Sequence, residues 1–291
     1  MDQAEQLRNI IKAGNLQRPV ARVITVTSGK GGVGKSNTAI NLAIQFRKMG
    51  QRVIILDADF GLANIEIMFG AVPKHNLCDL IYQGKNIKEI ITWGPMEVGF
   101  ISGGSGIVGM SNLSKDYLNY IIQNLTELDA IADVIIVDTG AGISDAVLEF
   151  LVASGEILLV TTPEPTSITD SYSLLKALVR HPRFSQETSQ VKMIANKVDK
   201  EEDGQALYEK LNAVVSRYLK LPFGYLGPIP QDNQLSKAVM QQVPVSMQNP
   251  TAKSSQAYES IAAKLMNKEE TVRKRGMAAF FSHILNGKKM G

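Results

Sequence analysis

The stretch Gly29-Lys30-Gly31-Gly32-Val33-Gly34-Lys35-Ser36 decides the fold of this 291-residue chain. It matches the pattern G-x-x-x-x-G-K-S/T, whose glycines let backbone N–H groups close around phosphates. In this pattern the lysine, here Lys35, reaches the terminal phosphates, and the hydroxyl, here Ser36, binds Mg²⁺. An apolar run at 23–27 precedes the stretch and a helical segment at 36–49 follows it. This context favours a nucleotide-phosphate site over a glycine-rich turn that matches by chance.

The rest of the chain alternates short apolar runs with longer helical segments. Because each run is apolar nearly throughout, it is typical of a strand covered on both faces in a parallel sheet. The expected strands are 23–27, 53–56, 134–137, 157–161, 191–195 and 225–229, and the expected helices are 36–49, 115–129, 143–154, 166–179 and 206–219. The alternation predicts an α/β protein with a three-layer P-loop NTPase fold, in which helices flank a mostly parallel central sheet.

Composition excludes several classes of protein. The 31 basic and 28 acidic residues leave a net charge of +3, which gives little support for nucleic-acid binding. The single cysteine, Cys78, excludes a disulfide framework and any cysteine-paired zinc or iron–sulfur site. The sequence has no apolar run of about 18 residues, and its polar beginning is unlike a signal peptide. We therefore expect a cytoplasmic protein.

Three aspartates follow predicted strands and make up a candidate metal and water site. Asp57 and Asp59 end the second strand, and Asp138 ends the third. Carboxylates at the carboxyl ends of strands beside a phosphate loop lie where Mg²⁺ and water must be placed. Either Asp57 or Asp59 alone could instead cap the next short helix. Gly140 and Gly142, just after Asp138, would form a movable switch that senses the γ-phosphate.

The base site is less sharply defined by the sequence. Asn196-Lys197-Val198-Asp199 follows a predicted strand and matches the N-K-x-D pattern with which many GTPases bind guanine. The later loop Gly227-Pro228-Ile229-Pro230 is a second candidate for lining the base. On these residues alone, ATP and GTP both remain open.

Several motifs resemble one known family. Lys30 makes the phosphate loop similar to the deviant Walker A form of MinD-like and ParA-like ATPases. The stretches DADFGLANIEIMFG and VIIVDTGAGISDAV, the residue Asn37 and the segment 161–170 resemble FlhG, the flagellar-number regulators also called FleN or YlxH. The resemblance covers almost the whole chain.

The resemblance implies ATP and Mg²⁺ as cofactors and a role for each site residue. Lys30 would act on the ATP of a facing subunit, Asp59 would position water, and Asn196 would contact adenine while Asp199 remains a loop or cap residue. The implied catalytic residues are Lys30, Lys35 and Asp59; the metal site is Ser36, Asp57 and Asp138; and the nucleotide site is Gly29, Lys30, Gly31, Gly32, Val33, Gly34, Lys35, Ser36, Asn37, Asn196 and Pro230.

Each end of the chain is expected to be an appendage of a core domain at 19–270. Residues 1–18 resemble the FlhG helix that stimulates the signal-recognition-type GTPase FlhF, with Gln3, Leu7 and Arg8 as partner-binding residues. The alternative is a polar helix without a function. Residues 271–291 carry an apolar stripe flanked by basic residues, which is typical of a helix that binds anionic lipid, or else of a helix packed on the core. The stripe is Met277, Phe280, Phe281, Ile284 and Leu285.

The resemblance implies an ATPase switch that dimerises with ATP and controls flagellar number or placement. Its expected partners are a second copy of the chain, FlhF, components of the flagellar basal body and the inner face of the cell membrane, without specific nucleic acid. The rival hypotheses are a MinD-type division-site regulator, a ParA-type DNA-segregation ATPase and a binding module with an inactive ATP site.

Overall fold

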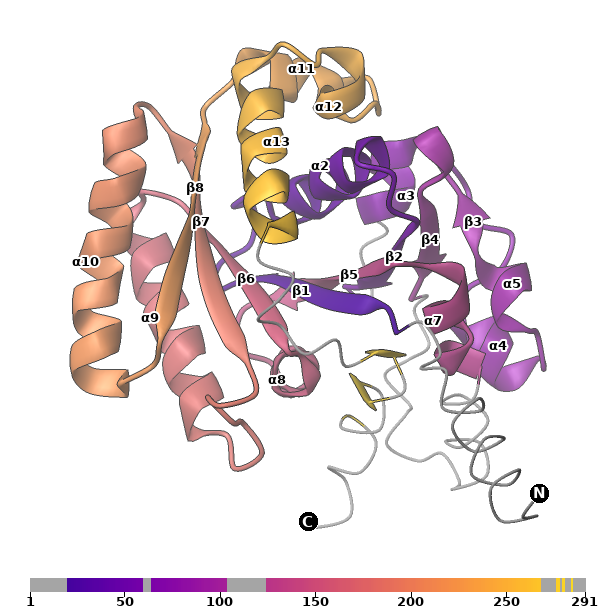
Figure 1. The fold of residues 1–291 in the computed structure, drawn as a ribbon, viewed down its shortest axis with the longest axis horizontal. Helices are drawn as coiled ribbons and strands as arrows, with labels where there is room; N and C mark the ends of the chain where they lie inside the picture. Colours follow the sequence, from indigo (N-terminus) through magenta and orange to yellow (C-terminus); the bar gives the residue numbers. More distant parts are fainter. Residues whose placement is uncertain are drawn as a thin grey trace, which may run out of the picture.

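The computed structural model describes residues 20–59, 64–103 and 124–267, together with residues 276, 277, 279, 280 and 284. Its core is one eight-stranded sheet in the order β3-β4-β2-β5-β1-β6-β7-β8, parallel except for the edge strand β3 (Figure 1). The strands are β1 (Arg22–Ser28), β2 (Val53–Ala58), β3 (Thr92–Trp93), β4 (Gly99–Ser102), β5 (Val134–Ala141), β6 (Glu156–Thr161), β7 (Gln190–Val198) and β8 (Phe223–Pro230).

Helices cover both faces of this sheet (Figure 1). On one face, α2 (Lys35–Lys48) and α13 (Lys253–Met266) pack over one set of alternating strand residues, together with α3 (Asn64–Phe69) and α12 (Val245–Gln248). On the other lie α8 (Asp145–Ala153), α9 (Pro165–Arg180) and α10 (Glu201–Leu219), then α4 (Leu77–Tyr82), α5 (Ile87–Ile90) and α7 (Leu128–Ile131). Two short elements, η1 (Pro95–Glu97) and α11 (Asn233–Met240), complete the described residues.

The predicted fold class is confirmed, and each of the six predicted strands is present. Strands β3 and β4 were not predicted, because they are short and β4 begins with a glycine. Helix α10 begins at Glu201, earlier than predicted, because three acidic residues in its first turn suit the positive end of a helix. Most of the predicted helix 115–129 lies outside the described residues, and α7 occupies its end.

A buried ion cluster joins the amino-terminal ends of three strands. Arg22 on β1 donates a hydrogen bond to each carboxylate oxygen of Glu156 on β6. The Nε–Oε2 and Nη2–Oε1 distances are 2.9 and 3.0 Å. Lys192 on β7 binds the same carboxylate. Arg22 also donates to the carbonyl of Leu265 at 2.9 Å, near the end of α13. The cluster therefore links the sheet to the last helix before the C-terminal segment.

Part of the predicted C-terminal stripe is buried against the core. Met277, Phe280 and Ile284 are 0%, 1% and 6% exposed and share a hydrophobic cluster with α7 and α8. The ring centroids of Phe280 and Phe150, on α8, lie 6.0 Å apart. For these three residues the structure shows a helix face packed on the core.

One carboxylate marks the start of this docked segment. Asp129 Oδ1 accepts hydrogen bonds from the backbone N–H of Met277, at 3.0 Å, and of Ala21, at 3.3 Å. Phe281 and Leu285 lie outside the described residues, as do Gln3, Leu7 and Arg8 at the other end. Among the described helices, none is long and apolar enough to cross a membrane.

Candidate functional site

The phosphate loop connects β1 to α2 at the carboxyl end of the sheet. Gly32 and Gly34 have φ angles of +76° and +96°, which only glycine adopts without strain. Gly29 is glycine for a different reason, since a Cβ there would lie 2.3 Å from the backbone carbon of Asp170 on α9. The first glycine of the motif thus packs a helix against the loop, while the later ones shape the turn.

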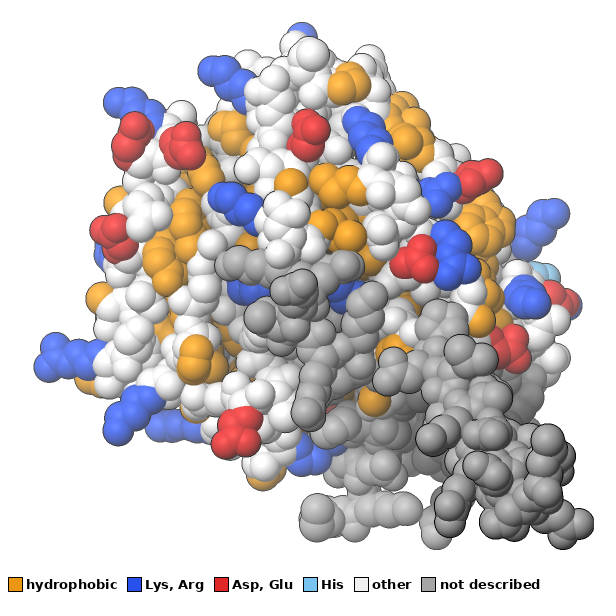
Figure 2. Space-filling view, in the orientation of Figure 1, with side chains coloured by type: hydrophobic (Ala, Val, Ile, Leu, Met, Phe, Trp, Pro, Cys, Tyr) orange, Lys and Arg blue, Asp and Glu red, His pale blue; other side chains and the backbone are white. Residues whose placement is uncertain are grey.

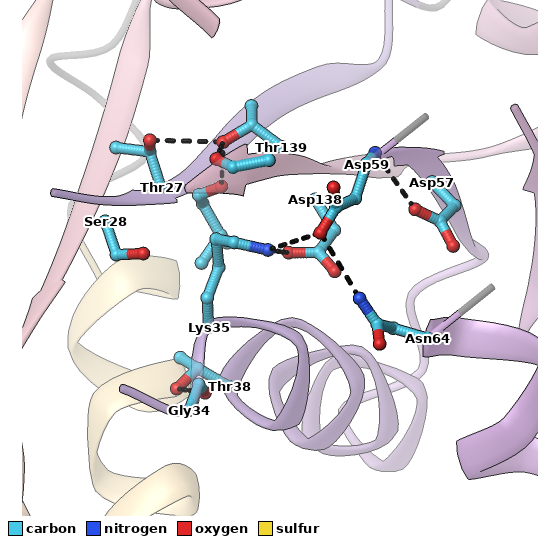
Figure 3. A network of polar contacts seen from close by, with 12 residues as sticks. Thr27, Ser28, Gly34, Lys35, Thr38, Asp57, Asp59, Asn64, Asp138 and Thr139 are labelled. Carbon is cyan, nitrogen blue, oxygen red and sulfur yellow. Dashed lines mark hydrogen bonds and ion pairs between the residues drawn. The ribbon is translucent and has the colours of Figure 1, made fainter. Parts of the chain in front are cut away.

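Lys35 extends from α2 to the carboxylates of Asp138, in β5, and Asp59, just after β2 (Figure 3). Its Nζ lies 3.0 Å from Asp138 Oδ1 and 3.8 Å from Asp59 Oδ2. Burial raises the pKa of Asp138, and the ammonium of Lys35 acts against that rise. The loop lysine therefore neutralises part of a buried acidic site.

The same carboxylates leave acceptors for a cation. Asp138 Oδ2 is buried without a hydrogen-bond partner among the described residues, and the Ser36 side chain hydrogen-bonds the same carboxylate. Burial and the negative charge of Asp138 raise the pKa of Asp57 to about 7. A divalent cation would relieve this repulsion. Mg²⁺ binds proteins through few carboxylates plus water and substrate phosphates, and Ser36, Asp57 and Asp138 offer such oxygen ligands.

Asp59 lies beside the metal candidate Asp57 and beside Gly140, near the end of β5. Its backbone N–H donates to Asp57 Oδ1 at 3.1 Å, and its Oδ2 accepts from Asn64 Nδ2 at 3.2 Å (Figure 3). A Cβ at Gly140 would lie 3.3 Å from Asp59 Oδ1. Asp59 is therefore close to Lys35 and Gly140, and it is only partly buried. A carboxylate in this position could hold a water molecule near a terminal phosphate.

Lys30 turns away from this cluster and binds its own chain. Its Nζ lies 2.6 Å from Glu164 Oε2 and 2.8 Å from Thr166 Oγ1, at the start of α9. The contact with Lys30 lowers the pKa of Glu164. Both side chains are open to solvent, so this ion pair can exchange at little cost.

Asn196 and Lys197, at the end of β7, hold the phosphate loop from the side. Asn196 Nδ2 donates to the carbonyl of Val33 at 2.7 Å, and Lys197 Nζ donates to that of Gly32 at 2.8 Å. Pro230 lies on the next strand, paired with Val198. Of the predicted base residues, Asn196 therefore contacts the phosphate loop directly, and Pro230 lies on the neighbouring strand.

The structure brings Lys35, Asp57, Asp59 and Asp138 together, turns Lys30 toward α9, and adds four residues whose contacts the sequence did not indicate. These are Asn64, Glu164, Thr166 and Lys197 in its contact with Gly32. The sequence shows an asparagine five residues after Asp59 and a glutamate at the start of α9, but its pattern does not show that they bind Asp59 and Lys30.

Comparison with known proteins agrees with this geometry. The family model described as ParA, NUBPL iron-transfer P-loop NTPase, matches residues 19–266. The antiactivator FleN of Pseudomonas aeruginosa is 38% identical over 89% of this chain and 91% of its own length. The flagellum site-determining protein YlxH of Helicobacter pylori is 33% identical over 98% of each chain.

Solved structures give the same fold at lower identity. The MinD of Pyrococcus horikoshii, complexed with Mg-ADP, superimposes with a TM-score of 0.66 at 21% identity over 86% of this chain and 98% of its own. The MinC:MinD complex of Aquifex aeolicus superimposes with a TM-score of 0.67 at 22% identity, over 88% of this chain and 100% of that one. The chain therefore belongs to the ParA family of P-loop NTPases, and FleN and YlxH place it among the flagellar regulators of the MinD/ParA ATPases.

Proposed function

We propose that this chain is a switch that dimerises on ATP, hydrolyses it with Mg²⁺ to ADP and phosphate, and so controls flagellar number or placement. The observation that carries the proposal is the contact of Lys35 with Asp138 and Asp59, at 3.0 and 3.8 Å. ATP would draw Lys35 onto its terminal phosphates, and Mg²⁺ would take the place of the ammonium beside Asp138. The carboxylates would then respond to the state of the nucleotide.

The chemical roles follow from position. Ser36 and Asp138 would hold the Mg²⁺ shell, with Asp57 ordering its water, and the cation would spread the charge of the β- and γ-phosphates. Asp59 would orient the attacking water. Lys30 would leave Glu164 and reach the nucleotide of a facing subunit, where an added cation stabilises the charge that develops in the transition state.

Helix α8 would transmit the change at the nucleotide site to the C-terminal segment. This helix begins at Asp145, shortly after the switch residues Gly140 and Gly142, and its Phe150 contacts Phe280 of the C-terminal segment. We propose that formation of the ATP dimer shifts α8 and frees residues 271–291 to bind the inner face of the membrane. Residues 1–18 would contact FlhF and stimulate its GTPase, and basal-body proteins would be further partners.

Charge argues for this function over DNA segregation. Basic and acidic side chains are interspersed on the face seen in Figure 2, and the totals are 31 and 28. Nonspecific DNA binding depends on a concentrated basic surface.

The experiment is a replacement of the chromosomal gene by its Lys35→Ala form, with flagella counted per cell by electron microscopy. We expect the number or position of the flagella to change in this strain. Lys48→Ala, which alters a lysine on the same helix but outside the site, is the control and should leave the flagella unchanged. A normal count in the Lys35→Ala strain would contradict the proposal.

A further inference from the structure

Two side chains at the carboxyl-terminal end of β7 tie this strand to the phosphate loop. Asn196 is 2% exposed, and its amide group donates to Val33 and accepts from the backbone N–H of Lys197, at 2.7 and 2.9 Å. A Cβ at position 34 would lie 2.2 Å from Asn196 Nδ2, so Gly34 is also needed to admit this amide. The base end and the phosphate end of the site therefore form one unit.

Lys197 stabilises this unit in an unusual backbone conformation. Its φ is +57°, a left-handed conformation that costs a residue with a Cβ on the order of 1 kcal/mol or more. The conformation directs Nζ to the carbonyl of Gly32, at 2.8 Å, across 165 positions of sequence. This hydrogen bond fixes the end of β7 against the phosphate loop.

Asp199 completes the pattern. It is exposed, and within the described part of the chain no hydrogen bond or ion pair occupies its carboxylate. It directly follows Val198, which pairs with Pro230 and accepts a hydrogen bond from the backbone N–H of Gln231 at 2.8 Å. Asn196, Asp199 and Pro230 thus lie at the carboxyl ends of two adjacent strands, the edge of a parallel sheet at which ligands bind.

The chemistry of these groups separates the two purines. An amide NH₂ has two N–H donors, so Asn196 can bond Val33 and also donate to a purine N7, which adenine and guanine share. A carboxylate only accepts hydrogen bonds. Guanine offers it two donors, N1–H and the 2-amino group, whereas adenine presents an unprotonated N1 that a carboxylate repels. Asp199 therefore favours guanine.

We propose that the nucleotide site accepts guanine nucleotides as well as adenine nucleotides, with Asp199 as the residue that binds the guanine edge. The proposal rests on the nucleotide-binding site of the function proposed above and extends its substrate class. It also gives Asp199 a role other than that of a loop or cap residue. The switch would then respond to both nucleotide pools of the cell.

The test is a titration of the full chain with fluorescent ADP and GDP in the presence of Mg²⁺. We expect the GDP dissociation constant to lie within about 10-fold of the ADP value. Asp199→Ala removes hydrogen bonds to a charged group, so GDP should bind about 10- to 100-fold more weakly while ADP binds as before or slightly better. Glu202→Gln, an exposed carboxylate in the first turn of α10, is the matched control and should change neither constant.

A second variant tests the recognition itself. Xanthine carries an oxygen in place of the 2-amino group of guanine, so Asp199→Asn, which offers a donor, should gain affinity for xanthosine diphosphate as it loses GDP. The proposal is overturned if the native chain binds GDP more than about 100-fold more weakly than ADP, or if Asp199→Ala weakens both equally. Loss of binding to both nucleotides by the native chain would overturn the proposed switch as well.

Discussion

Lys30 and Glu164 form an ion pair within one chain, with 2.6 Å between Nζ and Oε2, and Thr166 adds a hydrogen bond at 2.8 Å. The lysine that the proposed mechanism sends to a facing subunit is therefore held by its own α9. Dimerisation has to exchange one set of partners for another. Because the pair is solvent-exposed, the exchange is easy, and the terminal phosphates of ATP offer a stronger partner than a single carboxylate.

The two loop lysines should fail in different ways. Lys30→Ala should keep ATP affinity and lose ATP-dependent dimerisation, because its contacts lie outside the phosphate cluster. Lys35→Ala should lose nucleotide binding itself, because Lys35 is buried beside Asp138. Size-exclusion chromatography with light scattering, with and without ATP, measures the fraction of dimer. Titration with a fluorescent nucleotide measures the binding affinity. Equal loss of affinity in both variants would rule out a role for Lys30 across the interface.

Asp59→Ala should bind ATP and dimerise but hydrolyse it at least about 100-fold more slowly, since general-base and water-positioning groups contribute on the order of 10²–10⁴. The variant should accumulate as an ATP dimer, which phosphate release and light scattering would detect. Asn64→Ala, which removes the 3.2 Å hydrogen bond to Asp59, should give a smaller reduction. If the Asp59→Ala protein hydrolyses ATP at the normal rate, another residue positions the attacking water.

A chain that ends before Gly276 should not pellet with anionic vesicles in ATP, whereas the full chain should, with binding that falls as salt rises. Burying each large apolar side chain of the segment in the membrane would contribute roughly 1.5–3 kcal/mol to the binding free energy. The conformational entropy lost when the segment becomes ordered offsets most of this contribution. Two segments on one dimer act at about millimolar effective concentration and raise avidity by roughly 10²-fold.

The docked state provides a control for this experiment. Asp129→Ala removes the acceptor for the Met277 N–H, so the segment should leave the core more readily. The variant should bind vesicles in ADP more than the native chain does. Vesicle binding by the truncated chain would show that the membrane contact lies elsewhere.

A peptide covering residues 1–14 should stimulate the GTPase of FlhF, and Gln3→Ala should weaken the effect. So short a peptide forms little helix in water and would become ordered on its partner. Phosphate release by FlhF is the measurement, and a scrambled peptide is the control. If neither the peptide nor the full chain stimulates FlhF, the N-terminal segment has another role.

Glu156→Gln should lower the free energy of unfolding by about 3–5 kcal/mol, because it leaves Arg22 and Lys192 as buried charges without a counter-ion. Asp133→Asn, which alters the exposed pair with Arg52, should cost about 0–1 kcal/mol. Urea denaturation measures both. Nucleotide affinity should not change in either variant, since these pairs lie at the opposite end of the sheet from the phosphate loop. Equal stability of the two variants would contradict this account.

The sequence predicts the parts of this molecule whose physics is local. Buried parallel strands are apolar throughout, so β1, β2 and β5 to β8 could be located, and the phosphate loop has a pattern of its own. The apolar spacing of Met277, Phe280 and Ile284 indicates one helix face, but spacing cannot distinguish lipid from Phe150 as the surface that covers it. The Lys30 contact could not be foreseen either, because Glu164 lies 134 positions away.

The position of β1 in the sheet has a consequence for how the chain folds during synthesis. Although β1 is the first strand of the described residues, its partners among them are β5 and β6, which come much later in the chain. Its partner residues, such as Val134 for Arg22, leave the ribosome more than about 100 residues later, a delay of roughly 5–20 s at ordinary elongation rates. During that time the apolar strand that carries the phosphate loop has both edges open, and such edges promote aggregation. We expect the nascent chain to rely on chaperones until residue 161, the end of β6, has emerged.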